Sequence, residues 1–235
     1  MGLPDEVMNN HKRFESELSI YNELIEKALE CQIIDPDDMN SLIHSGMKLV
    51  SSVSGKTMKI SKILIEGIFL NLVTLWESLV EKDIISLFMQ DTTNYCKKYG
   101  YELEKCISWD LAEAILIGDK YRDFKLDDAK NILVTDLNIF NKIPIEIKKI
   151  IEKMCVIRNQ IAHNSRYSYN KYHKEILNNH GIKKGHIIEP YILLWSYKIE
   201  GNKTYLRMLF SSEKSMIEIY IDILKKASQS MLGNI

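Results

Sequence analysis

The sequence predicts a mainly α-helical protein, and three observations lead to this class. The 235 residues include only four prolines and ten glycines, so long uninterrupted elements are favoured. Leu, Ile, Lys, Glu and Asn dominate the composition, which favours helix over strand. A hydrophobic content of 46% with 27% charged residues is typical of a globular soluble protein and excludes a disordered chain. At this length we expect one well-buried core.

The N-terminal third of the chain is expected to form three helices. Apolar residues recur at three- and four-residue steps from Glu6 to Gln32, which predicts an amphipathic helix. Asp35 and Pro36 predict the start of a second helix that ends near Ser54. The longest helix is expected over residues 56–89, and its sequence is apolar nearly all round, as in the central helix of a bundle.

The rest of the chain is expected to be helical apart from one hairpin. The expected helices are Trp109–Ile117, closed by Gly118, then 125–140, 145–163 after Pro144, and 213–231. Two segments rich in Ile, Leu, Tyr and Trp, 191–199 and 204–210, flank Glu200–Lys203 and predict a β-hairpin. We therefore expect a single domain over 1–235, with N-terminal helices at about 6–54, a core bundle at about 56–165, and a hairpin and C-terminal helix at about 186–231.

The charge is unevenly distributed along the chain. Residues 1–152 carry 18 Lys and Arg against 26 Asp and Glu, whereas residues 153–207, here called the basic sector, carry 10 against 3. The basic sector also holds four of the six histidines. Such an asymmetry is typical of a surface that binds a polyanion, although a solvated lysine-rich segment would give the same count.

One hexapeptide in the basic sector combines groups suited to phosphate chemistry: Arg158-Asn159-Gln160-Ile161-Ala162-His163. Asn159 and His163 are four residues apart and share a helix face, while Arg158 lies about 140° from His163. Either the arginine side chain reaches round the helix, or the helix ends at the histidine; Asn164 and Ser165 favour an end there. An imidazole can act as acid or base, and a guanidinium can bind two phosphate oxygens.

This R-x4-H pattern resembles the signature of the HEPN superfamily, whose catalytic members cut RNA without a metal. The resemblance covers residues 145–165 closely and the remainder only in architecture, and it implies a HEPN-like bundle with the hairpin as an addition. It implies that Arg158, His163 and Asn159 are catalytic, with Glu77 on the long preceding helix as a supporting candidate. It also implies a homodimer, in which two motifs share one cleft and supply the second proton-transfer group.

The expected function is that of a metal-independent endoribonuclease that cuts RNA by attack of the 2′-hydroxyl, of the toxin or antiphage-defence kind, with no cofactor. The resemblance implies an antitoxin or sensor protein as a further partner. The alternative function is that of a non-catalytic HEPN module that binds RNA, nucleotide or a partner protein. A third hypothesis is a purely structural helical dimer. The motif residues could instead have a purely structural role, in which Arg158 pairs with a surface acid and His163 caps its own helix.

RNA-binding candidates come from the basic sector beyond the motif. Aromatic and basic residues alternate just after His163, and a lysine pair follows; the candidates are Arg166, Tyr167, Tyr169, Lys171, Lys183 and Lys184. Packing into the hairpin or core would explain the tyrosines equally well. Three further histidines lack acidic or cysteine partners at metal-ligand spacing, so we interpret His173, His180 and His186 as solvated loop residues rather than metal ligands.

The cysteine pattern and the absence of a signal peptide at Met1–Pro4 predict reduced thiols of a cytosolic protein. The most apolar stretch, Ile63 to Trp76, is interrupted by Glu66 and Asn71, and at this length we do not expect it to span a membrane.

Overall fold

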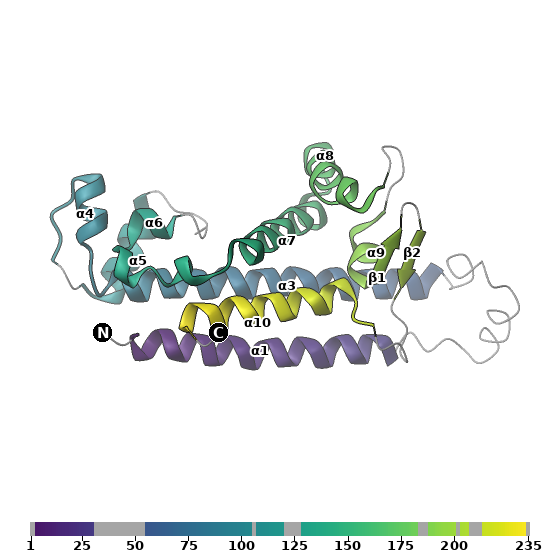
Figure 1. Ribbon diagram of the computed structural model, residues 1–235, viewed down its shortest axis with the longest axis horizontal. Helices are drawn as coiled ribbons and strands as arrows, with labels where there is room; N and C mark the ends of the chain where they lie inside the picture. Colours follow the sequence, from purple (N-terminus) through teal and green to yellow (C-terminus); the bar gives the residue numbers. More distant parts are fainter. Residues whose placement is uncertain are drawn as a thin grey trace, which may run out of the picture. The chain divides into compact units, whose positions relative to one another are not determined.

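The computed structural model describes residues 3–30, 55–104, 107–119, 128–182, 188–200, 203–206 and 213–233. This part of the chain is mostly helical, which confirms the predicted class (Figure 1). The second expected helix, residues 35–54, lies outside the described residues, as do Lys183, Lys184 and His186.

The elements follow one another in a fixed order along the chain. The α-helices are α1 (Asp5–Glu30), α3 (Gly55–Phe88), α4 (Thr93–Tyr99), α5 (Trp109–Asp119), α6 (Ala129–Ile132), α7 (Ile145–His163), α8 (Arg166–Glu175), α9 (Pro190–Trp195) and α10 (Met216–Leu232). Short 3₁₀ turns occupy Thr135–Leu137 (η1), Ile139–Lys142 (η2) and Leu177–His180 (η3), and the strands are β1 (Ser196–Glu200) and β2 (Lys203–Leu206).

Two of the expected helices in the middle of the chain differ from the structure. Gly118 does not close α5, which continues to Asp119. The helix expected over 125–140 is broken, because Leu133 and Val134 are extended and the turns η1 and η2 follow them. The buried residues of this stretch therefore pack from short turns rather than from one continuous helical face.

The segment expected to be the first hairpin strand also differs. Residues 190–195 form the short helix α9, with Pro190 in its first turn, and the strand begins only at Ser196. Proline is favoured in a first helical turn because its missing N–H has no helical partner there. β1 and β2 pair antiparallel, with Ile199 opposite Thr204.

The contacts within the chain define two compact units, each made of segments distant in sequence. Unit 1 consists of residues 1–18, 73–151 and 223–235, and unit 2 of residues 19–72 and 152–222. Neither unit corresponds to one of the consecutive regions that the sequence distinguishes, because each combines early, middle and late parts of the chain.

In unit 1, segments of α1, α3 and α10 lie side by side around a shared core (Figure 1). Phe14 packs edge-on against Trp76, with ring centroids 5.9 Å apart. A buried polar network joins the same three helices: His11 Nε2 lies 2.8 Å from Asp83 Oδ2, and His11 Nδ1 lies 2.6 Å from Ser228 Oγ. These contacts connect positions that are distant in sequence.

In unit 2, α7 and α10 pack their apolar faces into the core that positions the motif. Met154 and Ile157 on α7 are almost fully buried, as is Phe69 on α3, whose ring lies 5.8 Å from that of Tyr220. Tyr172 on α8 is also buried, and its hydroxyl donates a hydrogen bond to the carbonyl of Ile188. Burial raises the pKa of the Tyr172 and Tyr220 hydroxyls, so both stay protonated at neutral pH.

Helix α3 is longer than the apolar stretch considered in the sequence. By length and composition alone, Lys62–Phe88 would suffice to cross a membrane, a criterion that the core helix of a soluble protein also meets. In this chain 44% of the apolar window is buried, including Phe69 in unit 2 and Trp76 and Phe88 in unit 1, whereas Ile63 is 73% exposed.

Candidate functional site

The hexapeptide occupies the last turns of α7, as the sequence predicts. The helix follows Pro144 and ends at His163, with Asn164 in the left-handed region at φ 42°. Asn is one of the few residues apart from glycine that adopts this conformation readily, so it stops the helix directly after the histidine. The second option derived from helical geometry, an end at His163, is therefore confirmed.

The apolar side of the motif helix belongs to the core. Met154 is 1% exposed and Ile157 is fully buried, so these residues are not free to form an interface between two copies of the chain. The opposite side is accessible: Ala162 and His163 are exposed, and Arg158 and Asn159 are half-buried. A partner that contacts α7 must therefore meet its polar side.

A hydrogen bond turns the arginine toward the histidine face. Arg158 Nη1 donates to Asn159 Oδ1 at 3.0 Å. Asn159 precedes His163 by four residues and lies only about 40° from it around the helix axis. The bond therefore holds the guanidinium beside the carboxamide that shares a helix face with the imidazole.

The sequence reasoning missed one residue of this region, Gln160. Its side chain is buried and bridges the end of α7 to the beginning of α8, through Asn164 and Ser168. A glutamine on a predicted helix surface gives no sign of this role, because its two partners are identified only by the turn between the helices.

The residues after the motif form a helix rather than a loop. Ser165 caps α8, since its Oγ accepts from the Ser168 backbone N–H while Ser168 Oγ accepts from the Ser165 N–H. Arg166 and Lys171 are exposed, and Tyr167 is 78% exposed, so three of the six RNA-binding candidates lie on an accessible helix surface.

Tyr169, the fourth candidate on α8, is half-buried and its ring lies 6.1 Å from that of His173. Tyr169 therefore contributes to packing within unit 2 as well as to the edge of the surface. Lys183 and Lys184, the remaining two candidates, lie outside the described residues.

The interpretation of the other histidines as solvated loop residues was wrong for the two that the structure describes. His173 is buried on α8, and its Nε2 has no hydrogen-bond partner among the described residues. His180 ends η3 and is half-buried; burial, and then the charge of Lys153, lower its pKa. Both belong to the packed part of unit 2, because α8 and η3 replace the expected loop.

The structure assigns Glu77 and the motif to different units. Glu77 is half-buried on the part of α3 in unit 1, whereas Arg158 and His163 belong to unit 2. The acidic residue of α3 in unit 2 is Glu66, whose pKa is raised by burial and further by Glu189.

Glu66 belongs to a polar cluster that the sequence did not reveal. Lys62 Nζ pairs with Glu189 Oε2 at 2.5 Å and also lies over the ring of Tyr191, 5.7 Å from its centroid. The hydrogen bond to Glu189 raises the pKa of Lys62. This cluster joins α3 to α9 across 127 positions of sequence, so no local pattern could predict it.

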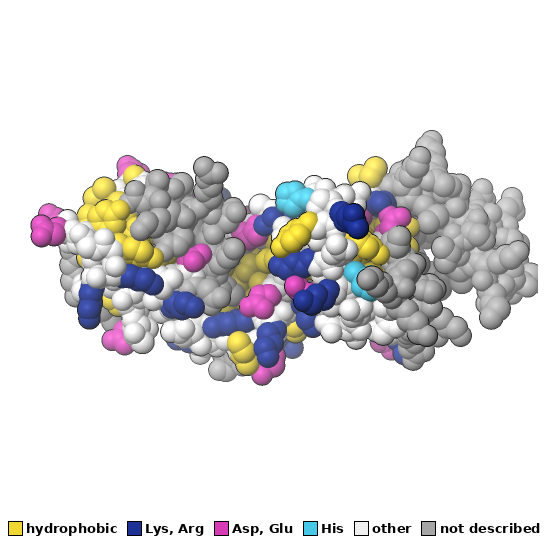
Figure 2. Space-filling view, turned by 90° about the horizontal axis from the view of Figure 1, so that it is seen from above, with side chains coloured by type: hydrophobic (Ala, Val, Ile, Leu, Met, Phe, Trp, Pro, Cys, Tyr) yellow, Lys and Arg dark blue, Asp and Glu magenta, His cyan; other side chains and the backbone are white. Residues whose placement is uncertain are grey.

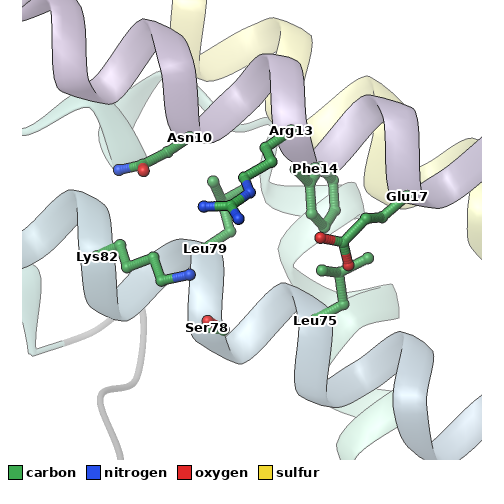
Figure 3. A pocket seen from close by; sticks show the side chains of 8 residues that line it. All are labelled: Asn10, Arg13, Phe14, Glu17, Leu75, Ser78, Leu79 and Lys82. Atoms are coloured by element: carbon green, nitrogen blue, oxygen red, sulfur yellow. The ribbon is translucent and has the colours of Figure 1, made fainter.

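Two cavities formed by described residues belong to unit 1. One lies between α1 and α3, has a volume of about 30 Å³ and is lined by Asn10, Arg13, Phe14, Glu17, Leu75, Ser78, Leu79 and Lys82 (Figure 3). That volume is about the share of one water molecule in the liquid, far below a nucleotide. The other, about 370 Å³, lies beside α4 and is lined by Thr92, Thr93, Cys96, Lys97, Tyr101 and Leu103. Neither contains a residue of the motif.

The exposed surface over α8 and the end of α7 carries more positive than negative charge. Figure 2 shows Lys and Arg side chains gathered on this face near a histidine, with acidic side chains interspersed among them. Arg158, Arg166 and Lys171 supply cations within unit 2. Such a surface attracts a polyanion, and its effect is screened by salt.

Among the described residues, no group of three or more His, Cys, Asp or Glu side chains is arranged to hold a metal ion. Comparison of the chain with models of known families, with curated proteins and with solved structures finds no match.

In chemical terms, the end of α7 offers three functions on one accessible side. A guanidinium can bind phosphate oxygens and stabilise added negative charge, an imidazole can transfer a proton, and a carboxamide holds the guanidinium in place. One copy supplies a single imidazole, whereas in-line cleavage of RNA uses one proton transfer to remove the 2′-hydroxyl proton and another to protonate the leaving oxygen.

Proposed function

We propose that this protein is a metal-independent endoribonuclease of the HEPN type, a toxin or antiphage-defence effector that acts as a homodimer. The observation that carries the proposal is the end of α7, where the Arg158 guanidinium is bonded to Asn159 on the side of the exposed His163. The basic surface of α8 directly after the motif supports RNA as the substrate.

In the proposed reaction the 2′-oxygen attacks the adjacent phosphorus. His163 of one protomer removes the proton from the 2′-hydroxyl as the P–O2′ bond forms, and the partner's His163 protonates the 5′-oxygen as the P–O5′ bond breaks. Arg158 binds the non-bridging oxygens while negative charge builds up on them. The products are a 2′,3′-cyclic phosphate and a 5′-hydroxyl.

The dimer brings two motifs into one cleft, as an isologous two-fold interface duplicates every group. Because Met154 and Ile157 are committed to the core, the proposed interface uses the polar side of α7. Ala162 is exposed on that side, and its small side chain permits close approach of a second helix. A separate antitoxin or sensor protein would hold such an activity in check.

The proposal is tested with the purified full chain and single-stranded RNA in excess EDTA. Cleavage should leave cyclic phosphate ends, and His163→Ala or Arg158→Ala should slow it by about 10²-fold or more. Arg13→Ala, which removes an exposed arginine of α1, is the matched control and should cut at the wild-type rate. Expression should arrest growth for wild type and the control, but not for His163→Ala.

Two results would contradict the proposal in different ways. Activity that is lost with EDTA and restored by Mg²⁺ or Mn²⁺ would refute the mechanism while leaving RNA as a substrate. RNA that binds but is never cut would favour the non-catalytic HEPN module, with Arg158 and His163 as binding groups only.

A further inference from the structure

The corner between α7 and α8 is held by side-chain hydrogen bonds. Only Asn164 and Ser165 separate the two helices, and Asn164 adopts a positive φ of 42°. The Asn164 N–H donates to the Gln160 carbonyl at 3.0 Å, which closes the last turn of α7. The Ser165–Ser168 capping box fixes the first turn of α8.

Gln160 connects these two local features. Its Nε2 donates to Asn164 Oδ1 at 3.1 Å, and its Oε1 accepts from Ser168 Oγ at 2.9 Å. The residue is only 6% exposed, so its amide would lose stabilisation without such partners. A buried side chain bonded at both ends in this way restricts the angle between α7 and α8.

The surface that this corner presents combines the motif with an aromatic and basic stripe. Tyr167 and Lys171 are four residues apart and share one face of α8, whereas Ser168 and Tyr172 form its buried face. The stripe begins four residues after His163. An exposed aromatic ring beside a cation is suited to stack a base and bind its phosphate.

We propose that Gln160 is a positioning residue, which clamps α8 to the end of the motif helix so that Tyr167 stacks on a base next to the phosphate held at Arg158 and His163. The inference rests on the proposed ribonuclease function. It limits the substrate to single-stranded RNA, because a paired and stacked base has no free face for Tyr167.

The clamp itself is tested without RNA. In Gln160→Leu, which retains the bulk of the side chain but loses both bonds, backbone amides of residues 165–171 should exchange hydrogen faster, while those of α10 keep their protection. Asn164→Gly is the milder variant, since glycine accepts the positive φ and only the bond from Gln160 Nε2 is lost. Its exchange should lie between wild type and Gln160→Leu. Unchanged exchange at 165–171 in both variants would overturn the clamp.

The positioning role is tested by a double-mutant cycle on a single-stranded oligonucleotide with 2′-deoxy sugars, which binds but cannot be cut. Tyr167→Ala should weaken binding about 10-fold in the wild-type background. In the Gln160→Leu background the same change should cost less than about twofold, because Tyr167 is no longer held in place, and in the Asn164→Gly background the cost should be intermediate. Lys174→Ala, an exposed substitution farther along α8, is the control and should have the same small effect in each background.

The outcomes separate this inference from the function on which it rests. An equal cost of Tyr167→Ala in every background refutes the positioning role while the ribonuclease stands. A wild-type protein that neither binds nor cuts single-stranded RNA refutes the function and the role of Tyr167 together, whatever the exchange experiment gives. Equal affinity for paired and unpaired RNA overturns the assigned substrate class alone.

Discussion

Replacing His11 by alanine tests how unit 1 is held together. The imidazole is 1% exposed and bonds Asp83 through Nε2 at 2.8 Å and Ser228 through Nδ1 at 2.6 Å. Asp83 is fully buried and receives one further hydrogen bond, from Asn10 Nδ2 at 3.0 Å. His11 is therefore the central member of a network that joins α1, α3 and α10. Its burial leaves no room for a substrate, in contrast to a catalytic Ser-His-Asp arrangement.

The expected cost follows from what the substitution leaves behind. In His11→Ala the carboxylate of Asp83 stays in the core with Asn10 as its remaining side-chain partner, and the hydroxyl of Ser228 loses its imidazole. Leaving a buried carboxylate without its main hydrogen-bonding partner lowers the free energy of unfolding by about 3–5 kcal/mol. Ser228→Ala removes a single hydrogen bond and should cost about 1 kcal/mol.

The dependence on pH has a definite sign. Burial raises the pKa of Asp83 above that of an ordinary carboxyl, and the hydrogen bond and charge of His11 oppose this rise. Without His11 the pKa rises further. A folded-state pKa above the unfolded value contributes stability that is complete below the unfolded pKa and is lost as pH rises through the folded one. His11→Ala should therefore lose stability as pH rises from about 4 to the folded-state pKa of Asp83.

The assay is urea unfolding followed by circular dichroism, at pH 5 and at pH 8. At pH 8 the double variant His11→Ala, Asp83→Asn should be more stable than His11→Ala alone, because a neutral amide replaces an unpaired carboxylate. The reasoning is refuted if His11→Ala lies within about 1 kcal/mol of wild type, or if the second substitution destabilises the protein further at pH 8.

Two other predictions concern assembly and RNA binding. Light scattering at assay concentration should give the mass of a dimer. A mixed dimer of inactive Arg158→Ala and His163→Ala chains keeps one arginine and one histidine in the cleft, so it should recover only a small part of the wild-type activity, because the second proton transfer lacks its imidazole; a fully active monomer would leave the shared cleft without support. RNA binding should weaken steeply with salt, and Lys183→Glu with Lys184→Glu should weaken it at low salt with the fold intact by circular dichroism. Unchanged binding would show that the basic sector is only a solvated surface.

The elements that could be predicted from the amino-acid sequence are those whose signals are local. Amphipathic periodicity predicted α1, a long stretch that is apolar nearly all round predicted most of α3, and Pro144 with Asn164 placed the limits of α7, including its end at His163. Such signals work because a helix buries one face and ends where its backbone groups find other partners. Helix α8 was not predicted, because its sequence is polar and rich in tyrosine. Which of its residues are buried depends on the segments that pack against it in the folded protein.

Tertiary structure decided what these elements do in space. His11, Asp83 and Ser228 are brought together from positions 72 and 217 apart in sequence, and Lys62 meets Glu189 across 127 positions. It also assigned Glu66 rather than Glu77 to the unit of the motif. A buried polar group is stable only when a partner is supplied, and that partner comes from whichever segment the packing brings close, so no local pattern reveals it.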